Sequence, residues 1–148
     1  MILEHTLKNT GSKILESSVY DHNFLVIDHQ SPGPPLHVLF PFEIYADRAM
    51  AGLAEAGGHE IRYIKTPSGN ERAATGITGF SNSVKDYDIT VENRARGAAV
   101  RITGDHPLER FAYWSIASVI APEPFIHVRV EPGKEFRWSI HYQFYILQ

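Results

Sequence analysis

The sequence lacks cysteine altogether, so disulfide bonds, thiolate metal sites and a cysteine nucleophile are excluded. It also lacks an excess of positive charge: 14 lysines and arginines stand against 17 aspartates and glutamates, a formal net charge of −3. This balance offers no electrostatic basis for binding nucleic acid or an anionic membrane. No apolar run reaches the length of a membrane span, and residues 1–13 do not have the pattern of a secretory signal. We therefore expect a cytoplasmic protein that binds neither nucleic acid nor membranes.

The motifs that hold metals, phosphates or serine nucleophiles are missing as well. There are eight histidines, but no two are spaced as His-x-His, and no His-Glu-x-x-His helix occurs. There is no Gly-x-Ser-x-Gly turn, and the glycines of residues 68–81 do not have the spacing of a phosphate-binding loop. That stretch is better described as a flexible loop that leads into a strand. We expect neither a metal nor a cofactor.

Apolar and polar residues alternate along much of the chain, which is the pattern of half-buried β-strands. Residues 136–146 and 126–130 both alternate in this way. The link between them, Glu-Pro-Gly-Lys, suits a type II hairpin turn in which Gly133 takes a positive φ. Short strands separated by Gly, Pro and Asn turns predict one all-β domain over residues 1–148, an antiparallel sandwich or barrel. Further strands are expected at residues 2–9, 22–28, 59–66, 87–93 and 98–105.

One segment departs from the strand pattern. Residues 47–58, "DRAMAGLAEAGG", are rich in Ala, Leu and Met, with Asp47 as a possible N-cap and two glycines as a possible stop. Propensity alone leaves two interpretations open, one short helix or an exposed loop with helical propensity.

Two residues of the chain are candidates for acid/base chemistry. His22 stands where a turn meets an expected strand, and a histidine can act as an acid near neutral pH. Glu123 stands between Pro122 and Pro124, which remove two backbone donors and suit a sheet edge or the rim of a cavity. A carboxylate held there could act as a base. Spacing alone leaves open whether these are two halves of one site or two unrelated surface residues.

Several stretches of the chain resemble aldose 1-epimerase, or galactose mutarotase-like, proteins. Residues 7–28, "LKNTGSKILESSVYDHNFLVID", are similar to a family strand that ends in Asn-x-Gly and leads to a Tyr/Asn-x-His-x-Phe stretch. Residues 33–44, "GPPLHVLFPFEI", follow this stretch as the corresponding segment does in the family. Residues 99–115 and 121–144 resemble the family's Trp-Ser strand, its glutamate segment and its Pro-Gly-x-x-x-x-Trp hairpin. The resemblance implies an antiparallel β-sandwich of the galactose mutarotase-like kind with at most one short helix.

The resemblance also implies roles for individual residues. His22 matches the histidine that protonates the ring oxygen of a sugar, and Glu123 matches the glutamate that removes the proton of the anomeric hydroxyl. The ring opens, the C1–C2 bond rotates and the ring closes to the other anomer, without a cofactor because both steps are proton transfers. Asp86 or Asp88 is a candidate for binding sugar hydroxyls. Trp114 or Trp138 could offer an aromatic face, although core packing is the simpler interpretation of both tryptophans.

The chain resembles only the C-terminal half of the family's proteins. The other half normally supplies an arginine, an asparagine and a second histidine to the sugar site, and the sequence has no counterpart of them. Half a sandwich exposes sheet edges and apolar surface, so we expect a homodimer or a separate partner chain. Three functions compete: a mutarotase acting on an aldose, a non-catalytic carbohydrate-binding or accessory subunit, and a cupin-like or other small sandwich that shares only the strand pattern.

Overall fold

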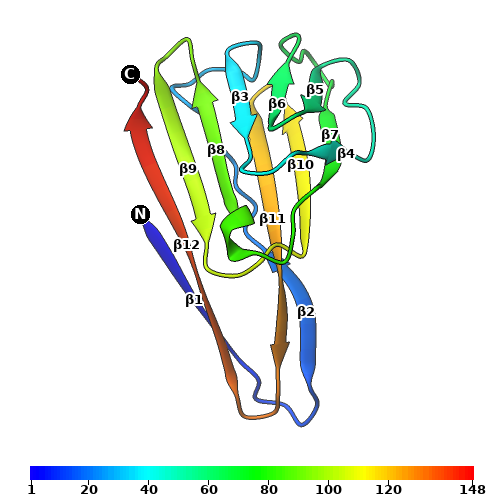
Figure 1. Cartoon of the computed structure of the whole chain (residues 1–148), viewed down its shortest axis with the longest axis vertical. Coiled ribbons are helices and arrows are strands. Elements are labelled where there is room, and N and C mark those ends of the chain that lie inside the picture. Colours follow the sequence, from blue (N-terminus) through cyan, green and yellow to red (C-terminus); the bar gives the residue numbers. More distant parts are fainter.

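The computed structural model describes all 148 residues as two antiparallel sheets packed as a sandwich (Figure 1). The strands are β1 (Ile2–Lys8), β2 (Leu15–Tyr20), β3 (Leu36–Leu39), β4 (Tyr45–Ala46), β5 (Ala54–Gly57), β6 (Glu60–Tyr63), β7 (Ala73–Thr78), β8 (Asp88–Asn93), β9 (Ala98–Gly104), β10 (Arg110–Ile116), β11 (Val119–Val130) and β12 (Glu135–Ile146). The larger sheet has the order β1-β12-β9-β8-β3-β6-β5 and the smaller sheet has the order β2-β11-β10-β7-β4. The only helical element is the 3-10 turn Val84–Asp86, so the predicted all-β sandwich is confirmed.

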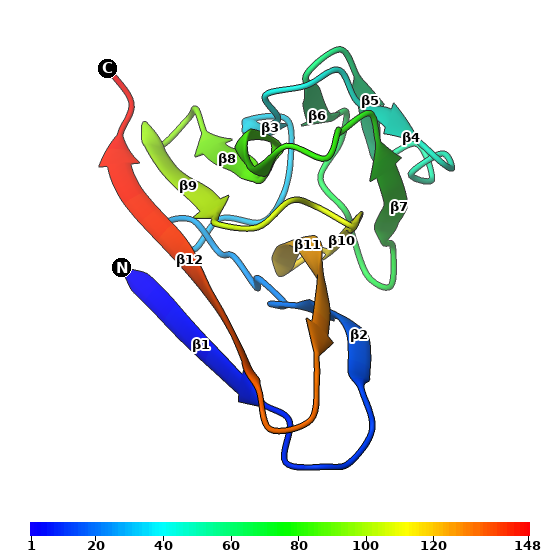
Figure 2. The ribbon, with the colours of Figure 1, turned by 60° about the horizontal axis from the view of Figure 1, so that its bottom comes forward.

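The two longest strands, β11 and β12, form the hairpin that joins the sheets. In the turn between them, the Lys134 N–H donates to the Glu131 carbonyl at 3.0 Å, and Gly133 has a φ of 75°. These two features confirm the predicted turn, because its third position requires a positive φ that glycine adopts without strain. Figures 1 and 2 show that the connection from β1 to β2 lies at the same end of the molecule as the turn between β11 and β12. The chain therefore crosses from one sheet to the other twice at this end.

The core lies between the sheets because successive side chains of each strand point to opposite faces. Val38 and Ile89 of the larger sheet face the core and are fully buried, and Phe111 and Tyr113 of the smaller sheet are 1% exposed. The residues that alternate with these on β10 therefore point to the outer face of the smaller sheet. That outer face carries the groove described below.

The strand predicted at residues 22–28 is wrong. Strand β2 ends earlier, at Tyr20, and the segment after it makes only one bridge, in which Leu25 exchanges hydrogen bonds of 2.8 and 3.2 Å with Ile120. The reason lies in β11 on the facing side. Pro122 and Pro124 have no N–H to offer the segment, so regular pairing with β11 stops where the prolines begin. The prolines do not lie on an edge strand, because β11 is an inner strand of the smaller sheet, but they lie where its pairing with β2 ends.

The Ala-rich segment 47–58 is neither a helix nor an exposed loop throughout. Ala51 and Gly52 have φ values of 54° and 68°, which a right-handed helix cannot accommodate. Leu53 is fully buried, and the residues after it form β5. The helical interpretation is therefore wrong, because the burial of Leu53 and pairing with β6 outweigh the local propensity of alanine.

Apolar side chains are exposed at one end of the larger sheet. Phe144 and Ile146 at the end of β12 are 66% and 82% exposed, and the neighbouring Met1 and Ile2 are 63% and 57% exposed. Beyond Tyr142, strand β12 pairs with β9 on one side only. No helix of the structure has the length and apolar character needed to cross a membrane. The partner chain and the cytoplasmic location remain predictions.

Candidate active site

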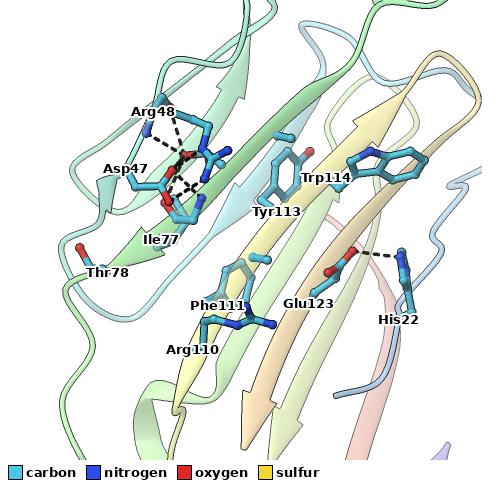
Figure 3. Close-up of a pocket in the computed structure, with 14 residues that line it drawn as sticks. His22, Asp47, Arg48, Ile77, Thr78, Arg110, Phe111, Tyr113, Trp114 and Glu123 are labelled. Atoms are coloured by element: carbon cyan, nitrogen blue, oxygen red, sulfur yellow. Dashed lines mark hydrogen bonds and ion pairs between the residues drawn. The ribbon is translucent and has the colours of Figure 1, made fainter. Parts of the chain in front are cut away.

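His22 and Glu123 are brought together on the outer face of the smaller sheet. The Nε2 atom of His22 lies 3.0 Å from Oε1 of Glu123 (Figure 3). Glu123 belongs to the proline-flanked part of β11 and lies opposite Ala112 of β10, so its side chain points away from the core. His22 lies two residues beyond the end of β2. The pair therefore forms by a tertiary contact between segments far apart in the sequence.

Asn23 fixes the segment that carries His22. The Asn23 side chain is buried, its Nδ2 donates to the carbonyl of Pro122 at 2.9 Å, and its Oδ1 accepts from the Tyr142 hydroxyl at 2.6 Å. Burial raises the pKa of Tyr142 to about 12, so this hydroxyl keeps its proton at neutral pH. Asn23 and Pro122 are the chain neighbours of His22 and Glu123, so their hydrogen bond holds the acid/base pair in register.

The Glu123 carboxylate is in a partly desolvated position. Its side chain is 12% exposed, and burial raises its pKa above the ordinary value of a glutamate. The positive charges of His22 and Arg110 act in the opposite direction but are outweighed. A carboxylate with a raised pKa is a better base than one in water, and the histidine beside it can supply a proton. The arrangement is suited to moving protons between two neighbouring atoms of a ligand.

Aromatic rings surround His22. The imidazole stacks on Phe24 with 4.0 Å between ring centroids, and Trp114 meets both rings edge-on at 6.3 Å. Trp114 is only half-buried and lines the groove, so core packing is the wrong interpretation for this residue. Trp138 is also half-buried, but it lies elsewhere, on β12, and stacks on His5 with 4.7 Å between ring centroids.

The groove in front of the pair has a volume of about 460 Å³. Its floor is the outer face of β7 and β10, where Ala74, Gly76 and Ala112 leave room above the sheet. Ala112 pairs with Glu123 on one side and with Gly76 on the other, so a small side chain lies directly beside the carboxylate. A cavity of this size accommodates a small molecule.

The far side of the groove is formed by Asp47 and Arg48, which the sequence interpretation did not assign to the site. The Arg48 Nε and Nη2 atoms donate to the Asp47 carboxylate at 2.8 and 3.2 Å, and the N–H of Gly76 donates to it at 3.0 Å. The Arg48 guanidinium and the Gly76 N–H hold the pKa of Asp47 far below its usual range. The available signal is the adjacent Asp-Arg pair in an otherwise Ala-rich stretch, although Asp47 there also suits a helix N-cap.

Asp86 and Asp88 do not line the groove. Asp86 accepts hydrogen bonds from the N–H and hydroxyl of Ser81 at 2.6 and 2.8 Å and so closes the loop that contains the 3-10 turn. Asp88 forms a two-pronged ion pair with Arg101 on the larger sheet. The structure thus gives both aspartates local structural contacts and leaves the groove to other residues.

No cluster of three or more His, Asp or Glu side chains in the chain has an arrangement that could hold a metal ion.

No protein-family model and no curated protein matches the sequence. Solved structures do match the fold. A Klebsiella pneumoniae protein, provisionally described as an aldose 1-epimerase, matches 97% of the chain with a TM-score of 0.71 and 14% identity. An Escherichia coli K12 protein with the same description matches 99% of the chain with a TM-score of 0.65 and 11% identity. The GalM/aldose epimerase homologue from C. elegans matches 99% with a TM-score of 0.64 and 13% identity.

The chain therefore has the fold of the aldose 1-epimerase and galactose mutarotase-like proteins. It spans 42% of the Klebsiella protein and 56% of each of the other two, which agrees with a resemblance to one half of such chains. The small cupin-like sandwich has no support among these structures. Because the identities are only 11–14%, the comparison defines the fold, and any activity must be argued from the site.

Proposed function

We propose that the protein interconverts the α and β anomers of an aldose by acid/base ring opening. The observation that carries the proposal is the 3.0 Å contact between His22 and Glu123 at the head of a groove of sugar size. The surrounding fold, which resembles aldose 1-epimerases, supports the same reaction. The reaction requires only two proton transfers, so it needs no cofactor.

The distance between His22 and Glu123 suits this chemistry. The anomeric hydroxyl oxygen and the ring oxygen of an aldose are bonded to the same carbon, so the groups that exchange protons with them must lie side by side. Glu123 removes the proton of the anomeric hydroxyl while His22, as imidazolium, donates a proton to the ring oxygen. The bond between C1 and the ring oxygen then breaks, and an open-chain aldehyde forms.

Reclosure restores both protonation states. After rotation about the C1–C2 bond, His22 takes back the proton of the hydroxyl that attacks C1, and protonated Glu123 returns its proton to the aldehyde oxygen. An ion pair between an imidazolium and a carboxylate is the resting state that this cycle requires, and the Nε2 to Oε1 contact is consistent with it. Across the groove, Asp47 and Arg48 offer an acceptor and several donors for sugar hydroxyls, the role first considered for Asp86 or Asp88.

A non-catalytic carbohydrate-binding subunit is the second candidate function. It is favoured by one observation, that the chain spans only about half the length of the structures that it resembles. The aromatic faces of Phe24 and Trp114 beside the groove would serve such a module equally well, because sugars stack on exposed rings.

Substitution of Glu123 by Gln separates the two functions. Anomer exchange of glucose and galactose would be followed by two-dimensional exchange NMR, and sugar binding by chemical-shift titration. A mutarotase loses exchange by about 10²-fold or more, the usual contribution of a general base, and keeps sugar binding within a few-fold. A binding module shows no exchange above the spontaneous rate in either protein. Glu135→Gln on the exposed end of β12 is the matched control.

A further inference from the structure

The outer face of the smaller sheet is hollowed beyond the acid/base pair. The outward row of β10 that includes Ala112 continues through Trp114 to Ile116. The outward row of the neighbouring β7 begins at Ala74, which pairs with Trp114, and the next outward position before it is Arg72. The two rows therefore extend the floor of the groove past Trp114.

A second groove lies on this extension. Its volume is about 460 Å³, the same as that of the groove beside Glu123, and Trp114 lines both. The other side chains that matter are polar: Ser31, Asn70, Arg72 and Ser118. Trp114 thus lies between two adjoining grooves of similar size, with the proton-transferring pair in only one of them.

The polar groups of the second groove are free to bind a ligand. Arg72 forms no ion pair with any carboxylate of the chain, unlike Arg48, whose guanidinium is taken up by Asp47. The loop that carries Arg72 is nevertheless held in place, because Glu71 accepts from the N–H of Ser68 at 3.0 Å and from Lys65 at 2.8 Å. The exposed Arg72 guanidinium therefore keeps all its donors for a ligand, on a loop whose backbone is held in place.

The length of the two grooves exceeds one sugar ring. From Ala112, which pairs with Glu123, to Ile116 is four residues along β10, or about 14 Å at the rise of an antiparallel strand. One pyranose ring at the pair cannot reach the second groove, whereas two rings joined end to end can. Trp114 lies at the midpoint, where an aromatic face can stack on either ring.

We propose that the second groove is a subsite for a second sugar residue, so that the preferred substrate is a reducing disaccharide. The reducing-end residue occupies the groove of His22 and Glu123, and the next residue lies over Trp114 and bonds to Arg72, Asn70 and Ser118. This inference rests on the proposed mutarotase function for the identity of the reducing end. The subsite itself can be tested by binding alone.

The test compares sugars of one and two residues by NMR chemical-shift titration of the ¹⁵N-labelled protein. The pairs are glucose with maltose and cellobiose, and galactose with 1,4-galactobiose. We expect at least one disaccharide to bind about tenfold more tightly than its reducing-end sugar, since a hydrogen bond to a charged group adds affinity of that order. Arg72→Ala should remove this advantage and leave monosaccharide binding unchanged, and Arg137→Ala, an exposed arginine on β12, should change neither.

The outcomes for the subsite and for the proposed function are separable. Equal affinity of every disaccharide and its monosaccharide, or an advantage that survives Arg72→Ala, overturns the second subsite even if anomer exchange is observed. If a disaccharide binds more tightly than its monosaccharide, if Arg72→Ala abolishes this difference, and if no anomer exchange is seen, the subsite is supported and the mutarotase function is excluded. Failure of every sugar to bind a folded protein overturns both.

Discussion

Replacing Asn23 by alanine tests how the acid/base pair is held in register. The Asn23 side chain is 6% exposed and links Pro122 on β11 to Tyr142 on β12 through hydrogen bonds of 2.9 and 2.6 Å. Alanine removes both bonds and leaves the Pro122 carbonyl and the Tyr142 hydroxyl in a buried position without partners. The segment that carries His22 then depends on the single bridge at Leu25.

The magnitude follows from these contacts. Two hydrogen bonds contribute about 1 kcal/mol each, and leaving buried polar groups unsatisfied adds a cost of about 1–3 kcal/mol. We expect Asn23→Ala to lower the free energy of unfolding by about 3 kcal/mol, a large share of the stability of a domain of this size. Tyr142→Phe removes only one of the two bonds and leaves only the buried Asn23 Oδ1 unpaired, so it should cost less, about 2 kcal/mol.

Urea denaturation followed by tryptophan fluorescence measures both variants. The double variant should cost less than the sum of the two single changes, because Asn23 and Tyr142 share a hydrogen bond. If anomer exchange is present in the wild type, it should fall more in Asn23→Ala than in Tyr142→Phe. A loss of stability below about 1 kcal/mol in Asn23→Ala, within the range of an ordinary surface change, would show that Asn23 does not fix the segment that carries His22.

Three further predictions concern the groove and the exposed end of the sheet. Because burial raises the pKa of Glu123, the rate of anomer exchange should fall on the acid side at a higher pH than for an ordinary glutamate. Arg110→Gln removes a positive charge that lowers this pKa, so the acid limb of the pH–rate profile should shift to still higher pH. Gly76→Ala places a methyl group 2.6 Å from an Asp47 carboxylate oxygen, so sugar affinity measured by titration should fall several-fold. An unchanged affinity would contradict the assignment of Asp47 and Arg48 to the side of the groove. We propose that a second copy of the chain covers Phe144, which is 66% exposed; light scattering should give a dimer that Phe144→Glu converts to a monomer, and a monomeric wild type would exclude it.

Much of the fold follows from local sequence patterns. The alternation along β12 and the Pro-Gly turn before it were sufficient to predict the hairpin, because each depends on neighbours in the chain. The strand expected at 22–28 failed for a non-local reason, since Pro122 and Pro124 on another strand determine whether that segment can pair. The alanines of residues 47–58 misled in the same way, because burial of Leu53 decides the conformation there.

The site was predictable only in part. His22 and Glu123 could be identified as candidates from residue type and from the family resemblance, but their 3.0 Å contact depends on tertiary structure. Asp47 and Arg48 enter the groove because the pairing of β4 with β7 brings them beside Gly76, which no local pattern encodes. Asp86 and Asp88 lie between the two motifs in the sequence, but nothing in the local sequence directs their side chains to the groove.

Anomer exchange by the wild-type protein shows whether His22 and Glu123 act as an acid and a base on a sugar. Two-dimensional exchange NMR of glucose, galactose and maltose would be recorded with the wild type and with a His22→Ala/Glu123→Gln double variant at equal concentration. We expect exchange well above the spontaneous rate for at least one sugar and a return to that rate in the double variant. Spontaneous exchange with the folded wild type for every sugar, or catalysis that persists in the double variant, would contradict the assignment of His22 and Glu123 as the acid and base.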